Sequence, residues 1–168
     1  NKKIFQDSLL EKYNNFDKKI FLDKSLENFF NIEIILEFFP NSKFIHTYRN
    51  FNDAIIAIYQ TMLPELSWCH KIDDIINYYN LYKNTIEYFK KKYPNKIIDV
   101  ELNKLTNQKE TETKKILNFC EIKYNENYLE YNKNFNLFNK TNSFLQVREK
   151  IKPYEDKKYQ EYYYLLNK

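Results

Sequence analysis

The sequence predicts an α/β fold, a parallel sheet flanked by helices, formed by one domain over residues 1–168. Short apolar runs of strand length alternate with longer segments of helical period, and prolines at 40, 64 and 94 end three of the helical segments. Alternating strands and helices are typical of parallel sheets with helices packed on them. The chain is 43% hydrophobic, which supplies enough apolar material for a core.

Three apolar runs are predicted to be strands, at residues 19–22, 43–48 and 96–102. Each is four to seven residues long and is bounded by charged or turn-forming residues, as expected for buried strands. We expect these strands to form the parallel sheet.

Helices are predicted between and around these strands. A helical pattern covers residues 6–13, and a second has an apolar face that ends at Pro40. Asp53 is expected to cap a third helix that runs to about Met62. A long amphipathic helix with a basic last turn is predicted over residues 73–89. A further helix is predicted over residues 110–119, and a terminal helix is predicted in the tail through Leu166. Residues 132–148 look irregular.

Composition excludes several function classes. Glycine is absent, so no Walker or Rossmann phosphate loop is present. The net charge of +4 is spread over short lysine clusters, which favours solvated helix faces over a nucleic-acid groove, and we expect no nucleic-acid partner. Cys69 and Cys120 lack disulfide or zinc spacing, so no metal is expected. Without an apolar run of membrane-spanning length or a signal peptide, we expect a cytoplasmic protein with no membrane span.

Four motifs occur in order along the chain. They are residues 23–29 (DKSLENF), residues 39–46 (FPNSKFIH) leading into Arg49-Asn50, Trp68 before residues 73–82 (DDIINYYNLY), and residues 143–148 (SFLQVR). Together they resemble the sulfotransferase superfamily. The resemblance is closest to the bacterial sulfotransferases of the tetratricopeptide-repeat type and to tyrosylprotein sulfotransferases, over the C-terminal part of the catalytic domain.

The resemblance implies an enzyme that moves a sulfuryl group from 3′-phosphoadenosine 5′-phosphosulfate to a hydroxyl or phenol. Lys24 stands where the family places a cation that stabilises the transition state, and Arg49 where it binds the 3′-phosphate. Ser143 resembles a serine that hydrogen-bonds the sulfuryl donor, with a catalytic and a cofactor-binding role, and Arg148 could reach a phosphate. Without the resemblance, we would interpret Lys24 as an exposed lysine in a turn and Arg49 as one partner of a salt bridge at the end of a strand. Ser143 would be a turn serine that hydrogen-bonds the local backbone. His46 and His70 lack partners at metal or triad spacing, so we interpret them as a strand and a loop histidine.

Several positions depart from the family. Ala57 replaces a serine that contacts the phosphate, Phe51 replaces a proline, and Leu102 and Asn103 replace a Tyr-Glu pair. The family's first strand and its Ser/Thr/Gly-rich phosphosulfate loop are missing before Lys24, so we expect this fragment to be inactive alone. The resemblance allows an upstream tetratricopeptide-repeat region. A non-catalytic scaffold domain is the alternative function, and the acceptor, whether peptide tyrosine, sugar or lipid, stays open.

Overall fold

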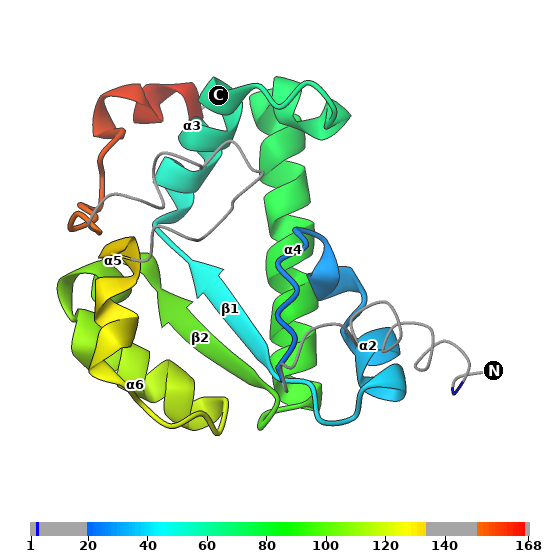
Figure 1. Ribbon diagram of the computed structural model, residues 1–168. Coiled ribbons are helices and arrows are strands. Elements are labelled where there is room, and N and C mark those ends of the chain that lie inside the picture. The colour runs from blue at the N-terminus through cyan, green and yellow to red at the C-terminus, as the bar shows by residue number, and fades with distance from the viewer. Residues whose placement is uncertain (1–2, 4–19, 134–150, 167–168) are drawn as a thin grey trace.

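The computed structural model describes residue 3, residues 20–133 and residues 151–166, without the side chains of residues 131–133. It is a helix-rich α/β structure built around a small parallel sheet (Figure 1). The predicted helix at residues 6–13 lies outside the described residues, as does most of the segment predicted to be irregular. Within the described ranges, no helix is long and apolar enough to cross a membrane.

The sheet pairs β1 (Phe44–Tyr48) with β2 (Ile97–Glu101) in parallel, and this confirms two of the three predicted strands. The register places Phe44 opposite Ile97 and Tyr48 opposite Glu101. The prediction of a strand at residues 19–22 is wrong for its described residues, because residues 20–25 form no strand. Their apolar side chains remain exposed, from 63% for Ile20 to 80% for Leu22. Burial of apolar surface therefore does not stabilise these residues as a strand.

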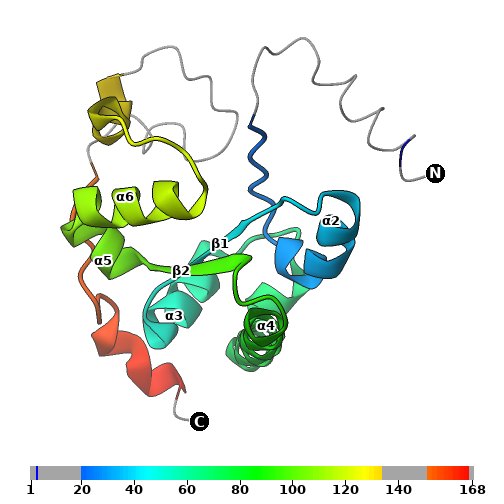
Figure 2. The ribbon, with the colours of Figure 1, turned by 90° about the horizontal axis from the view of Figure 1, so that it is seen from below.

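Helices cover both faces of the sheet. Figure 2 shows α3 (Phe51–Thr61) and α4 (Ile72–Lys92) on one side and α6 (Lys109–Phe119) on the other. These three helices were predicted. The short α5 (Leu102–Asn107) was not, because it follows β2 without a turn signal. The predicted second helix is interrupted, as 3-10 turn η1 (Asn28–Phe30) followed by α2 (Ile32–Phe38).

The remaining described elements are 3-10 helices. These are η2 (Ser67–His70), η3 (Glu126–Lys133) and, in place of the predicted terminal α-helix, η5 (Gln160–Leu166). His70 was interpreted as a loop histidine, but it is the last residue of η2 and is exposed there.

Two apolar clusters form the core. The first joins α2, α4 and β2 through Ile32, Ile86, Phe89 and Ile97. The second joins α3, η2 and α4 through buried Ile55, Cys69 and Ile75. Because α4 contributes to both clusters, it connects the packing of α2 and the sheet to the packing of α3 and η2.

The first turn of α3 differs from the sequence prediction. Asn50, not Asp53, caps the helix, and its side-chain oxygen accepts the Asp53 N–H at 3.2 Å. The other end fits the prediction more closely, because α3 ends at Met62 in the left-handed conformation, with φ 43°, two residues before Pro64. Capping by Asn50 leaves the Asp53 carboxylate available for other partners.

Those partners come from the C-terminal segment. The Asp53 side chain is 0% exposed. It accepts hydrogen bonds from the hydroxyls of Tyr154 and Tyr163, both at 2.8 Å, and from the N–H groups of Lys158 at 3.2 Å and Tyr159 at 3.1 Å. Burial by itself would raise the pKa of Asp53, but these hydrogen bonds to the charged form outweigh it and hold the pKa below its ordinary value. Asp53 therefore anchors the tail of the chain to the start of α3.

We expect Asp53→Asn to lower the free energy of unfolding by about 2 to 3 kcal/mol, because the new amide would present donors to donors in a buried site. Urea unfolding followed by circular dichroism measures this. Asp74→Asn, on the exposed first turn of α4, is the matched control and should cost less than about 1 kcal/mol. Equal losses in the two variants would contradict the anchoring role.

The same anchor predicts a pH dependence. Since the folded pKa of Asp53 is lowered, its contribution to stability is present above the ordinary aspartate pKa of about 3.9 and is lost as the pH falls through the folded value. Asp53→Asn should therefore flatten the acid limb of a plot of unfolding free energy against pH between roughly pH 5 and 2. If the acid limb of Asp53→Asn is as steep as that of the wild type, Asp53 does not contribute this pH dependence.

Candidate functional site

The carboxyl ends of both strands meet at one edge of the sheet, where α/β folds bind ligands. At this edge β1 ends at Tyr48 and α3 begins at Phe51, so Arg49 and Asn50 form the whole connection. β2 leads into α5 with no connecting residue. Two helix N-termini thus lie beside each other at the end of the sheet (Figure 1).

Arg49 is the cation at this end of the sheet. We call the region where the starts of α3 and α5 meet the end of the sheet the corner. Its side chain is half-buried, and its guanidinium carbon lies 5.9 Å from the centroid of the Tyr154 ring. Within the described part of the chain, Arg49 forms no ion pair with a carboxylate, so the strand-end salt bridge considered from the sequence is absent there. A planar guanidinium beside a helix N-terminus is suited to bind an anion such as phosphate.

Tyr154 is held at this corner from two sides. Its N–H donates to Thr106 Oγ1 at 2.8 Å, and its carbonyl accepts from Asn103 Nδ2 at 3.1 Å. Its hydroxyl donates to Asp53 Oδ2 at 2.8 Å. Asn103 fixes the C-terminal segment through its bond to the Tyr154 carbonyl. Tyr154 thus links the start of α5 to the start of α3.

A pocket of about 390 Å³ lies between the sheet and α4, and Arg49 is one of its lining residues. Residues on the sheet and on α4 line it, among them His46, Tyr79, Tyr82, Lys90 and Asp99. The residues of β1 and β2 that face α4 come from alternate positions along each strand, as the two-residue period of a strand requires.

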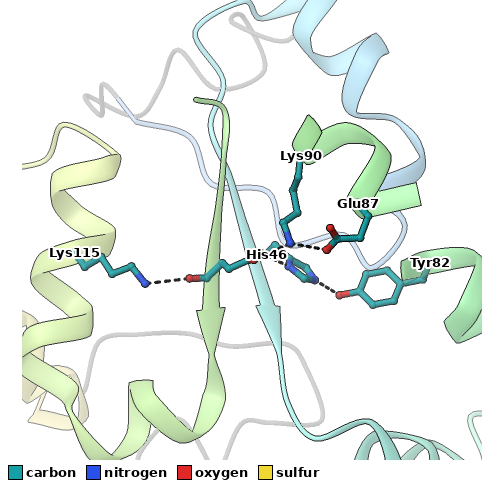
Figure 3. A network of polar contacts seen from close by, with 6 residues as sticks. His46, Tyr82, Glu87, Lys90 and Lys115 are labelled. Atoms are coloured by element: carbon teal, nitrogen blue, oxygen red, sulfur yellow. Dashed lines mark hydrogen bonds and ion pairs between the residues drawn. The ribbon is translucent and has the colours of Figure 1, made fainter. Parts of the chain in front are cut away.

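His46 belongs to a polar network in this pocket, although the sequence suggested no partner for it. Figure 3 shows the contacts. One ring nitrogen, Nδ1, lies 2.7 Å from Asp99 Oδ1, and the other contacts the Tyr82 hydroxyl. Lys90 forms ion pairs with Asp99 and Glu87, each at 2.7 Å. The parallel register places His46 directly opposite Asp99, which their separation in sequence concealed.

The protonation states in the network follow from its contacts. Burial raises the pKa of Tyr82, and nearby charges add to that shift, so its hydroxyl stays protonated at neutral pH. Burial would also raise the pKa of Asp99, but hydrogen bonds from Lys90 and His46 outweigh it and lower that pKa. The polar side chains satisfy one another, which makes the network a rigid wall of the pocket.

The other predicted site residues are placed as follows. The Lys24 side chain is exposed, and its amine forms no hydrogen bond or ion pair with the described residues. Its backbone is ordered by a turn in which the N–H and hydroxyl of Ser25 donate to Asp23 Oδ1, at 2.9 and 2.6 Å. Ser143 and Arg148 lie outside the described residues. The structure therefore positions Arg49 at the corner but does not bring Lys24 into contact with it.

Sequence reasoning missed the roles of Asp53 and Tyr154. One signal was available for Asp53, because Asn50 already offered a cap at the same helix start. For Tyr154, the signal was the repetition of tyrosines through the C-terminal segment. In the described part, no group of three or more His, Cys, Asp or Glu side chains could hold a metal ion.

Comparison with known proteins gives the family. The sulfotransferase family model matches residues 2–126, which include β1, Arg49, α4 and β2. An uncharacterized protein of Aquifex aeolicus (strain VF5) is 30% identical over 141 residues, which cover 77% of this chain and 18% of that relative. The chain thus spans less than a fifth of the relative's length. The match of the family model over most of the chain shows that it belongs to the sulfotransferase family.

Proposed function

We propose that this domain, in its intact protein, transfers a sulfuryl group from 3′-phosphoadenosine 5′-phosphosulfate to a hydroxyl or phenol. The observation that carries the proposal is the position of Arg49. It connects β1 directly to the N-terminus of α3, and no carboxylate of the described residues occupies its guanidinium. Family membership supports the 3′-phosphate of the nucleotide donor as the anion that this corner would bind.

Arg49 would bind the phosphate by a charge-assisted, bidentate contact. The guanidinium presents N–H donors in one plane, and the helix N-terminus adds partial positive charge. Both features act on the 3′-phosphate, whose charge is the same before and during the reaction. Arg49 would therefore contribute to donor binding more than to the chemical step.

Lys24 would act on the reaction itself. In sulfuryl transfer, the acceptor oxygen attacks sulfur and gives up its proton to a base or to water, while the bond from sulfur to the bridging phosphate oxygen breaks. The leaving 3′,5′-adenosine diphosphate takes the electron pair of that bond, so negative charge develops on the bridging oxygen. A cation beside that oxygen stabilises the transition state. The exposed Lys24 amine is free among the described residues to do so. Ser143 and Arg148 would complete the binding of the donor.

A non-catalytic scaffold remains the second candidate, because Ala57 lies on α3 where the family carries a phosphate-binding serine. Titration of the full-length gene product with 3′,5′-adenosine diphosphate separates the two. The enzyme account predicts saturable binding, and the scaffold account predicts none.

In the full-length protein, we expect Lys24→Ala to lower kcat by about 100-fold or more while the donor KM changes little, because the lost interaction forms only in the transition state. Steady-state kinetics with the labelled donor measure both constants. Lys123→Ala removes another exposed lysine and should leave both unchanged. An unchanged kcat in Lys24→Ala would remove Lys24 from the mechanism.

Arg49→Ala should have the opposite signature. The donor KM should rise by about 10- to 100-fold, as expected for the loss of charge-assisted hydrogen bonds worth roughly 1.5 to 3 kcal/mol. Arg49→Lys keeps the charge without the planar fork and should recover only part of the affinity. A donor KM equal to that of the wild type in Arg49→Ala would contradict the phosphate assignment.

Ala57→Ser tests the missing contact directly. Ala57 is half-buried on α3, and a serine hydroxyl there would add one hydrogen bond to the phosphate. We expect donor affinity to increase by roughly 2- to 10-fold, the effect of one hydrogen bond of about 0.5 to 1.5 kcal/mol. Weaker binding after the substitution would indicate that the phosphate does not reach this turn of the helix.

A further inference from the structure

We propose that Tyr154 is a positioning residue for Arg49, and that its ring holds the guanidinium at the corner where the donor phosphate binds. This inference rests on the proposed function. It concerns a part of the chain beyond residues 2–126, over which the family model matches.

The backbone of Tyr154 is fixed by α5. Its N–H and carbonyl are bonded to the side chains of Thr106 and Asn103, and Asn107 Nδ2 lies 3.4 Å from the same carbonyl. Thr106 is itself buried, and its hydroxyl donates to the carbonyl of Leu102 at 2.9 Å. The main chain at Tyr154 is therefore held by a helix that starts directly from β2.

The side chain of Tyr154 is fixed by α3. Its hydroxyl donates to the buried Asp53 carboxylate, and this contact together with burial raises the pKa of Tyr154, so that its proton remains on the phenol. With its backbone held by α5 and its hydroxyl held by α3, the ring is confined between the two helices. The Arg49 guanidinium carbon lies over this ring, 5.9 Å from its centroid.

A cation–π contact orders an arginine and keeps its N–H groups available to an oxyanion. A carboxylate partner would instead occupy those N–H groups. Ordering the side chain before the ligand arrives also reduces the rotamer entropy lost on binding.

Tyr163 provides a matched control. Its hydroxyl also donates to Asp53 at 2.8 Å, and it contacts Asn50 at 3.2 Å, but its ring makes no contact with Arg49 in the described structure. Substitution of Tyr154 or Tyr163 by leucine removes one hydrogen bond to Asp53 in each case. Only the first substitution also removes the ring beneath Arg49.

The test is calorimetric titration of the full-length protein with 3′,5′-adenosine diphosphate, with thermal melts of each variant. We expect Tyr154→Leu to raise Kd by about 3- to 30-fold, the range for a lost cation–π contact. Tyr154→Phe keeps the ring and should stay within about threefold of the wild type. Tyr163→Leu should lower Tm by as much as Tyr154→Leu, with Kd again within about threefold.

Pentafluorophenylalanine at position 154 covers the case in which Tyr154→Leu does not fold. It has the shape of phenylalanine with a reversed ring quadrupole, and should bind the nucleotide more weakly than Tyr154→Phe. If Tyr154→Leu and Tyr163→Leu bind equally, or if the two aromatic variants at 154 do, the positioning role is overturned. No saturable binding by the wild type would overturn the proposed function and this inference with it.

Discussion

The buried carboxylate of Asp53 connects parts of the chain that lie 101 to 110 residues apart. A carboxylate without solvent is costly unless donors surround it, and α3 itself supplies none to the side chain. The donors come from two tyrosine hydroxyls and two backbone N–H groups of the tail. The tail must therefore fold back onto the start of α3, and this brings Tyr154 to Arg49. Asn50 makes the arrangement possible because it caps the helix in place of Asp53.

The same edge of the sheet joins the candidate phosphate corner to the pocket between the sheet and α4. Arg49 belongs to both, since it follows β1 and is one of the residues that line the pocket. On the pocket side, His46 and Asp99 are neighbours in the parallel register and are held by Tyr82 and Lys90 from α4. This network fixes the distance between sheet and helix, so the corner rests on a rigid support.

Much of the fold and part of the site could be predicted from the sequence. The two observed strands and the long α4 are strongly periodic, and Arg49 follows a strand directly, so local patterns suffice for them. Residues 19–22 resembled a strand because of their composition, but strand formation requires a partner that no local pattern reveals. The contacts of Asp53, Tyr154 and His46 are long-range, and they depend on strand register and on the path of the tail.

The central claim is that the C-terminal segment, anchored on Asp53, places Tyr154 against Arg49 at the site of the donor's phosphate. A crystal structure of the full-length protein with bound 3′,5′-adenosine diphosphate tests it most directly. The account predicts the 3′-phosphate on the N–H groups of Arg49 at the start of α3, with the Tyr154 ring still beside the guanidinium. A nucleotide bound elsewhere, or a segment 151–166 displaced from Asp53 in the complex, would contradict it.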